Sequence, residues 1–164
     1  MINAKIIEKL QTSFGKNLLS VDESSDMLTI TVASSVIHDV VLFLKEDESL
    51  QFHFLTTLCG MHCPEQELPF GIIYHMHNFY RNQRIRIKAF VSLEHPAVKT
   101  VTDIFPTANW MERETYDFYG ILFDGHPNLK RILNVEDLDY FPMRKEYPLE
   151  DQTREDKDDR FFGR

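Results

Sequence analysis

The sequence has few of the residues that several functional classes require. Its 164 residues include only 2 cysteines and 6 glycines, and 18 basic side chains stand against 26 acidic ones. Two cysteines are too few to hold a secreted fold together and fit reduced thiols in a cytosolic protein. The net charge of −8 argues against a general nucleic-acid binder, because such proteins neutralise phosphates with an excess of Lys and Arg.

Long apolar runs are lacking as well. The purest run, from Val40 to Leu44, is far shorter than the roughly 18 residues that a membrane-spanning helix needs. Near the start of the chain, Lys5, Glu8 and Lys9 interrupt the apolar residues, which argues against the continuous apolar region of a secretory signal. We therefore expect a soluble chain that stays in the cytoplasm.

Glycine and cysteine spacing gives no cofactor motif. No two glycines are two residues apart, so the dinucleotide fingerprint G-x-G-x-x-G is absent from the sequence. Gly120 and Gly125 have phosphate-loop spacing, but His126 and Pro127 occupy the positions of its Lys and Ser/Thr. An iron–sulfur cluster normally takes four thiolates, which this chain cannot supply alone. We therefore expect no cofactor in this chain.

Hydrophobic residues make up 43% of the chain and predict a packed core. Three segments carry them at helical spacing: residues 2–14, 37–44 and 107–119. Gly15 and Gly120 follow the first and third segments at the position of a left-handed C-cap. Ser34 or Ser35 can cap the second helix. A further short helical stretch is expected between Pro96 and Pro106.

The remaining apolar residues alternate as in strands. Residues 18–32 predict a hairpin around a polar turn. The next strand is expected to place Phe52, Phe54 and Leu58 on one face. Residues 70–79 are apolar on both faces, which favours a strand with neighbours on each side and a layer over each surface. In the last strand, alternate residues from Ile85 to Leu93 point inward and Arg84, Arg86 and Lys88 point outward, so one face of the strand should be wet.

These elements predict an α/β fold of the α+β type. We expect a two-layer domain over residues 1–133, with a mixed sheet of about five strands covered by helices. Residues 134–164 have almost no periodicity and end in a stretch dominated by Asp, Glu, Lys and Arg. We expect them to form an extended, charged C-terminal tail.

A charged cluster occupies the third predicted helix. Glu112 and Asp117 lie near Arg113, and Asn109 with Glu112 has capping-box spacing. Carboxylates beside aromatic rings can be tuned for acid–base catalysis, but Arg113 and Asp117 are one turn apart and can pair, which lowers an acid's pKa. We therefore favour a charged, aromatic-rimmed surface completed by a partner. Trp110 is expected to pack into the core.

Three further groups of residues each have a structural and a functional interpretation. Cys59, His62, Cys63 and His53 could form a zinc site, but C-x-x-H-C is not a familiar spacing, and thiols near the end of a core strand are favoured. His75 and His77 would share one strand face, where hydrogen-bonded imidazoles are more common than metal ligands. The basic stripe over residues 81–88 is most simply a solvated face, with a partner's acidic patch as the alternative.

The run from Val101 to Leu133 resembles the signature of the C subunit of the respiratory NADH:quinone oxidoreductase, complex I. The matching residues are Trp110, Glu112, Arg113, Glu114, Tyr116, Asp117, Tyr119, Gly120, Gly125, His126, Pro127, Leu129, Arg131, Ile132 and Leu133. Residues 70–91 are similar to the family's strand hairpin. The stretch F-P-M-R-K-E-Y-P-L-E, which holds Arg144 and Lys145, is similar to its P-L-R-K-D-F-P-L segment, with Met143, Glu146 and Tyr147 as departures.

The resemblance implies a cofactor-free subunit of the hydrophilic arm. It would hold to the large D subunit and its neighbours near the quinone-reducing module, with FMN and iron–sulfur clusters in partner subunits, on the cytoplasmic side of the inner membrane. The assembly would pass electrons from NADH to quinone with ion translocation. Similar subunits occur in membrane-bound hydrogenases and related dehydrogenases, which stay open as alternatives. A stand-alone Cys/His enzyme and a nucleic-acid binder remain as less favoured hypotheses.

Overall fold

The computed structural model describes residues 2–24 and 27–148. Its main sheet has five strands in the order β1-β2-β5-β4-β3. These are β1 (Leu18–Asp22), β2 (Leu28–Ala33), β3 (Phe54–His62), β4 (Phe70–Asn78) and β5 (Gln83–Val91). β2 and β5 are parallel, whereas the other neighbours are antiparallel. The prediction of a mixed five-stranded sheet in an α+β fold is confirmed.

Three helices accompany the sheet: α1 (Ile2–Phe14), α2 (Ile37–Glu46) and α3 (Ala108–Tyr119). Short 3-10 turns, η1 (Gly15–Asn17) and η2 (Ser34–Val36), follow α1 and precede α2. Gly15 and Gly120 both have positive φ, as expected of left-handed residues at helix ends. The predicted serine cap is wrong, because α2 has Val36 as its N-cap and no side-chain cap hydrogen bond.

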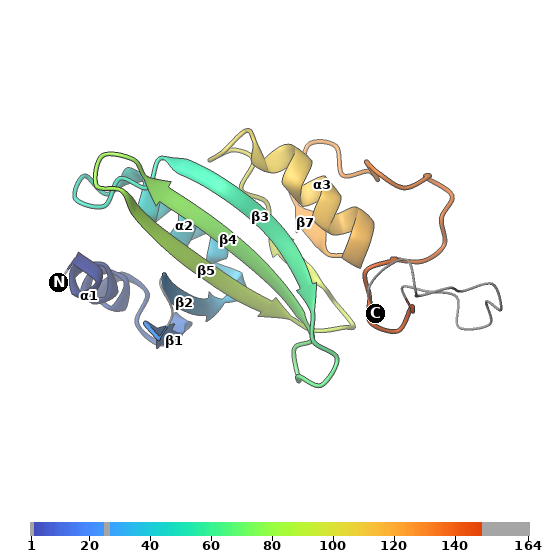
Figure 1. Cartoon of the computed structure of the whole chain (residues 1–164), viewed down its shortest axis with the longest axis horizontal. Coiled ribbons are helices and arrows are strands. Elements are labelled where there is room, and N and C mark those ends of the chain that lie inside the picture. Colours follow the sequence, from blue (N-terminus) through green and yellow to red (C-terminus); the bar gives the residue numbers. More distant parts are fainter. Residues whose placement is uncertain (1, 25–26, 149–164) are drawn as a thin grey trace, which may run out of the picture.

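One face of the sheet holds the core. The register places Ile30 of β2, Ile87 of β5, Tyr74 of β4 and Leu58 of β3 side by side, and all are buried. α1 and α2 contribute residues to this core, and Figure 1 shows α2 behind the sheet and α1 beside it at the left. α3 packs against β3, the edge strand, where Gly60 faces its side chains so closely that a Cβ there would meet the Tyr119 ring at 2.6 Å.

The opposite face of the sheet differs from what the sequence suggested for β4. Ile73 and His75 of β4 point to this face and are only partly buried, because the described helices leave it uncovered. The expectation of a layer over each surface of β4 is therefore wrong. The prediction that one face of β5 is wet holds, since Arg84 is exposed on it while Ile85 is buried.

Two other expectations fail for local reasons. Phe54 is 43% exposed whereas Phe52 and Leu58 are buried, because β3 begins only at Phe54 and its register shifts between Leu55 and Thr57. The short helix expected after Pro96 is instead β6 (Ala97–Lys99) followed by turns. β6 pairs in parallel with β7 (Leu122–Asp124) as a second, two-stranded sheet.

Residues 134–148, the first half of the predicted tail, contain no helix or strand. They run beside α3 at the right of Figure 1. The backbone N–H of Met143 donates to the carbonyl of Phe118 at 3.1 Å, so this part of the tail is attached to the domain. The rest of the predicted tail, 149–164, lies outside the described residues, and the boundary at residue 133 stays a prediction.

Candidate functional site: the α3 clasp

Asp117 organises the segment that follows α3. Its side chain is fully buried and accepts five hydrogen bonds. Three come from the backbone N–H groups of Ile132, Leu133 and Asn134, at 2.7 to 3.0 Å. The others come from the Asn134 amide at 3.1 Å and from the Arg131 guanidinium at 2.8 Å. We call Asp117 and residues 131–134 the clasp.

Arg131 extends the clasp to residues further along the chain. One of its terminal nitrogens donates to the carboxylate and the backbone carbonyl of Asp117, and the other donates to the carbonyls of Leu138 and Tyr140 at 2.7 and 2.8 Å. Its guanidinium also lies 4.9 Å from the centre of the Phe141 ring. One cation therefore ties α3 to three points of the segment 131–141.

The predicted Arg113–Asp117 pair is absent from this arrangement. Arg113 donates to the backbone carbonyls of Lys130 and Arg131, at 3.2 and 3.0 Å, and the ionic partner of Asp117 is Arg131. Helical spacing cannot reveal such a contact, because Arg131 lies beyond the end of α3. Arg113 and Asp117 thus hold the same segment from two positions on the helix.

The electrostatics of Asp117 follow from its donors. Burial alone would raise the pKa of Asp117, but the N–H groups of Asn134, Leu133 and Ile132 together with Arg131 outweigh burial and hold that pKa well below its ordinary range. Asp117 is therefore charged at neutral pH. A permanently ionised, fully paired carboxylate suits a structural anchor better than proton transfer.

Glu112 anchors the other end of α3. It is fully buried and accepts hydrogen bonds from the Thr100 hydroxyl at 2.5 Å and the Val101 N–H at 2.8 Å. These contacts replace the predicted capping box with Asn109, which is wrong. Burial raises the pKa of Glu112 to about 7, against the lowering effect of the two hydrogen bonds.

His126 and the two glycines shape the connection between α3 and the clasp. Nε2 of His126 donates to the Asn109 carbonyl at 3.1 Å, and Nδ1 accepts from the Asn128 N–H at 3.0 Å. Gly120 and Gly125 have φ values of 74° and 84°, in the region that favours glycine. Pro127 is exposed within this connection.

Arg144 and Lys145 contact residues of the main sheet. Nε of Arg144 donates to the Tyr119 carbonyl at 2.8 Å, and its guanidinium lies over the rings of Phe70 and Phe141. The backbone N–H of Lys145 donates to Nδ1 of His62 at 3.0 Å. The predicted site residues are thus gathered around α3, and most of their polar groups bind within the chain.

Sequence reasoning missed the contacts of four residues that complete this arrangement: Thr100, Asn134, Phe141 and Tyr119. Tyr119 takes part through its backbone carbonyl, which accepts from Arg144. Phe141 contacts Arg131, Arg144 and Tyr116, with its ring centre 6.0 Å from that of Tyr116. All four lie far from their partners in sequence or bind through the backbone. No local spacing signals such contacts.

A family model described as "Respiratory-chain NADH dehydrogenase, 30 Kd subunit" matches residues 30–153. The chain belongs to this family. Among its curated relatives, the C subunit of the NADH-quinone oxidoreductase of Roseiflexus castenholzii is 40% identical over 147 residues, which cover 90% of this chain and 84% of the relative. The corresponding subunit of Geobacter sulfurreducens is 36% identical over 154 residues, or 93% and 94% of the two chains.

Two solved structures share the fold of this family member. The trypsin-resistant fragment (1-134) of Nqo5 superposes with a TM-score of 0.67 at 24% identity, covering 79% of this chain and all of the fragment. A chain of the membrane-bound sulfane sulfur reductase, an archaeal respiratory membrane complex, superposes with a TM-score of 0.75 at 21% identity, covering 91% and 87%.

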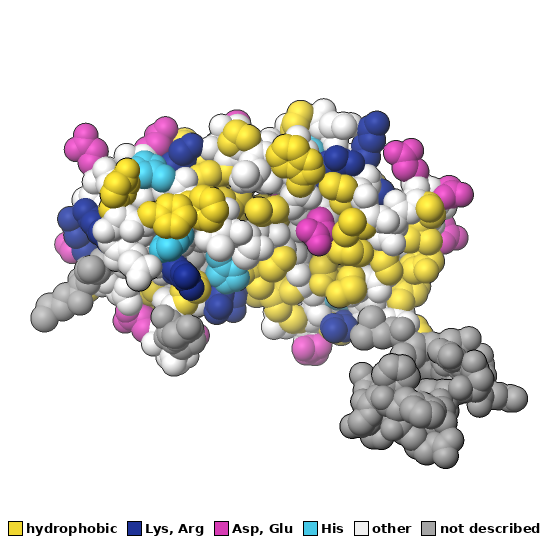
Figure 2. All heavy atoms as spheres, turned by 45° about the horizontal axis from the view of Figure 1, so that its top comes forward, with side chains coloured by type: hydrophobic (Ala, Val, Ile, Leu, Met, Phe, Trp, Pro, Cys, Tyr) yellow, Lys and Arg dark blue, Asp and Glu magenta, His cyan; other side chains and the backbone are white. Residues whose placement is uncertain are grey.

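The clasp of this family member leaves apolar side chains on the surface. Trp110, Leu133 and Val135 are 58%, 64% and 66% exposed, and Tyr140 and Met143 are also exposed. Figure 2 shows hydrophobic side chains gathered in its right half, over α3 and the segment that follows it. The expectation that Trp110 packs into the core is wrong, and Glu114 beside it is likewise exposed. We call Trp110, Leu133, Val135, Tyr140 and Met143 the apolar rim.

The described residues outside the clasp and the apolar rim give little support for a metal site or a membrane span. Within residues 2–24 and 27–148, no group of three or more His, Cys, Asp and Glu side chains could hold a metal ion, so the zinc hypothesis gains no support there. Cys59 is exposed on β3, and His62 is stacked on Phe70 at 4.6 Å. Over the same described residues, no helix is long and apolar enough to cross a membrane.

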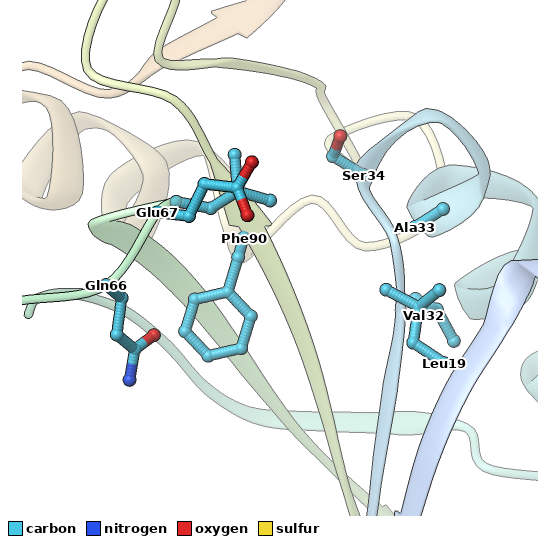
Figure 3. A pocket seen from close by; sticks show the side chains of 8 residues that line it. Leu19, Val32, Ala33, Ser34, Gln66, Glu67 and Phe90 are labelled. Carbon is cyan, nitrogen blue, oxygen red and sulfur yellow. The ribbon is translucent and has the colours of Figure 1, made fainter.

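A hollow of about 410 Å³ lies at the far end of the sheet from the β4–β5 turn. Leu19, Val32, Ala33 and Ser34 line one side of it, and Gln66, Glu67 and Phe90 line the other (Figure 3). None of the predicted site residues contributes to its lining. The hollow is therefore separate from the clasp.

Proposed function

We propose that the chain is a structural and assembly subunit of a NADH:quinone oxidoreductase, and that it docks on its neighbours, the large D subunit among them, through the apolar rim. The observation that carries this proposal is the combination of exposed apolar side chains with a rigid support. Three rim residues are more than half exposed, and the backbone of Leu133 is fixed by its hydrogen bond to Asp117. Exposed aromatic and aliphatic groups in fixed positions are typical anchors of protein interfaces.

The redox chemistry then belongs to other subunits. FMN and the iron–sulfur clusters would reside in partner chains, and this chain would shape and hold the arm near the quinone-reducing module. The buried polar groups of the clasp support this division, because Asp117 and Arg131 bind each other and the backbone instead of facing outward. The proposal places the assembled subunit on the cytoplasmic side of the inner membrane, as a peripheral component.

The test is co-purification from cells that assemble the complex, using a tagged full-length chain. The variant Leu133→Asp/Val135→Asp places charges on the rim, and we expect it to recover about tenfold less of the other subunits, because a buried unpaired charge at an interface is costly. Leu19→Asp/Leu93→Asp is the matched control, since both leucines are similarly exposed elsewhere. Equal recovery with both variants would contradict docking through the rim.

The same purification decides between related assemblies. Co-purifying chains identify a NADH:quinone oxidoreductase, or instead a hydrogenase or another dehydrogenase complex. Deletion of residues 134–164 tests the predicted tail: unchanged stoichiometry and quinone reductase activity would contradict a role for it in assembly. Protease access in inside-out and right-side-out vesicles tests the proposed cytoplasmic side.

A further inference from the structure

The face of the sheet that the described helices leave open is dominated by positive charge. Arg84, Arg86 and Lys88 of β5 alternate onto this face, and Arg81 lies in the turn before them. β2, β3, β4, β5 and the β4–β5 turn contain no Asp or Glu, although the whole chain has a net charge of −8. Figure 2 shows His, Lys and Arg side chains interspersed with hydrophobic ones in its left half.

These cations have no carboxylate partner in the part of the chain that the structure describes. The ion pairs there involve Lys9, His38, Arg131 and Arg144, none of which lies on this face. Asp22 of the edge strand β1 lies in the same cross-strand row as Thr29 and Arg86. Hydrogen bonds from Ser24, and then the charges of Lys88 and Arg86, lower the pKa of Asp22, although it forms no ion pair with either cation. The positive charge of the open face therefore forms no ion pair within the described residues.

Arg86 is held in position rather than left flexible. Its Nε donates to Nε2 of His75 at 2.8 Å, and one terminal nitrogen donates to the Thr29 hydroxyl at 3.4 Å. Burial, followed by the charges of Arg86 and Lys88, lowers the pKa of His75, which keeps the imidazole neutral as an acceptor. A fixed guanidinium is suited to receive a carboxylate with both of its oxygens.

An aromatic cluster adjoins these cations at the β4–β5 end of the face. The Phe79 ring centre lies 4.9 Å from that of Phe54 and 4.5 Å from that of His77. Phe79 is 61% exposed, and Tyr80 next to it is more exposed still. Arg81 in the same turn donates to the Ser49 carbonyl. Exposed rings next to fixed cations form a surface with both apolar and electrostatic character.

We propose that this open face, formed by Arg84, Arg86, Lys88, Phe54, Phe79 and Tyr80, binds an acidic segment of another subunit of the same complex. This proposal rests on the proposed function and adds a second docking surface to it. Charge complementarity selects the occupant: carboxylates would pair with the cations that lack an ionic partner, and apolar side chains would cover the rings. A second copy of the chain is disfavoured, because a symmetric contact would bring like charges together. The net charge of −8 disfavours nucleic acid.

The experiment compares two double charge reversals in the tagged full-length chain, produced in cells that assemble the complex. Arg84→Glu/Lys88→Glu alters the open face and leaves Arg86 in place. Lys5→Glu/Lys16→Glu makes the same change of charge on exposed residues of α1 and η1. We expect the first variant to recover about tenfold less of the other subunits and the second to match the wild type.

The outcomes separate this proposal from the proposed function. If the wild-type chain recovers no respiratory subunits, both fail. If it recovers them and the two double variants behave alike, only docking at the open face fails.

Photo-crosslinking tests the same surface without charge reversals, so its result does not depend on whether the charge variants fold. A benzophenone amino acid replaces Tyr80, which is exposed and lies in the turn between β4 and β5. An adduct with an Asp- and Glu-rich segment of another subunit supports the proposal. An adduct with lipid, RNA, a second copy of the chain or its own residues 149–164 would overturn it, as would the absence of any adduct in the intact complex.

Discussion

α3 buries one carboxylate toward each of its ends, and the pKa values of these two carboxylates shift in opposite directions. Glu112 and Asp117 are five residues apart on one helix, and both are fully buried. Glu112 receives one N–H and one hydroxyl, and its pKa rises to about 7. Asp117 receives five donors, including a guanidinium, and its pKa falls well below the ordinary range. Burial outweighs the two uncharged donors at Glu112, whereas the five donors at Asp117, one of them a cation, outweigh burial.

The comparison has a structural meaning. Asp117 binds a segment without helix or strand, residues 131–134, whose backbone N–H groups would otherwise lack partners. Glu112 binds residues 100 and 101, next to β6, and meets no cation there. We therefore expect removal of Asp117 to destabilise the chain, whereas neutralisation of Glu112 should stabilise it at neutral pH.

Asp117→Ala should have the largest effect on the chain alone. It removes the acceptor of three backbone N–H groups and leaves the buried guanidinium of Arg131 without its ionic partner. We expect a loss of about 3–5 kcal/mol in the free energy of unfolding, the range found when one partner of a buried ion pair is removed. Urea unfolding of the purified chain at neutral pH measures it.

Asp117→Asn is the matched control, because it keeps the shape and one acceptor oxygen while it removes the charge. Its loss should be smaller than that of the alanine variant. The stability that ionised Asp117 contributes is present above the ordinary pKa of 3.8 and is lost as the pH falls toward the lowered folded value. A loss below about 1 kcal/mol for Asp117→Ala would contradict the clasp as an anchor.

Glu112→Gln should have the next largest effect, with the opposite sign. The folded pKa of Glu112 is raised from 4.5 to about 7, so the unfolded chain releases this proton first as the pH rises. The wild type should therefore lose stability relative to the glutamine variant between about pH 4.5 and 7, by on the order of 3 kcal/mol. Unfolding curves of both proteins across this range test it, and a constant difference would contradict the raised pKa.

Gly120→Ala should cost less, and Gly15→Ala provides its control. Both glycines end helices at positive φ, where a Cβ costs about 1–2 kcal/mol. A Cβ at Gly120 would also lie 2.6 Å from the Phe141 ring and 2.7 Å from the Arg144 guanidinium, whereas Gly15 has nothing within 4 Å. The excess loss at position 120 therefore measures how tightly the segment after the clasp packs. Equal losses would mean that the segment moves aside.

Periodicity predicted the elements of the fold well, because alternation and helical spacing are local. The buried residues Ile37, Val40 and Leu44 of α2 were found in this way. Phe54 was placed on the wrong face, because the register shift after Leu55 reverses the alternation and has no signature in composition. Likewise, β6 has three residues and pairs with a strand after α3, so only its tertiary partner defines it.

For the candidate site, the sequence indicated the right helix but not its contacts. Arg113 and Asp117 have the spacing of an ion pair, yet each binds the segment around residue 131. A pair at helical spacing contributes only a few tenths of a kcal/mol, and a buried cluster of N–H donors outweighs it. Contacts between residues 14 or more positions apart depend on the path of the chain after α3.

Trp110→Ala should have the smallest effect on the isolated chain and thereby extends the comparison to the surface of α3. Its side chain is 58% exposed, so we expect a change within about 0.5 kcal/mol in the free energy of unfolding, instead of the loss that a core tryptophan would give. If the apolar rim docks on a neighbouring subunit, the same substitution should reduce recovery of the assembled complex by about tenfold or more, as truncation of an interface anchor does. A large loss of stability with normal assembly would assign Trp110 to folding, and would leave Leu133 and Val135 as the rim's only strongly exposed apolar anchors.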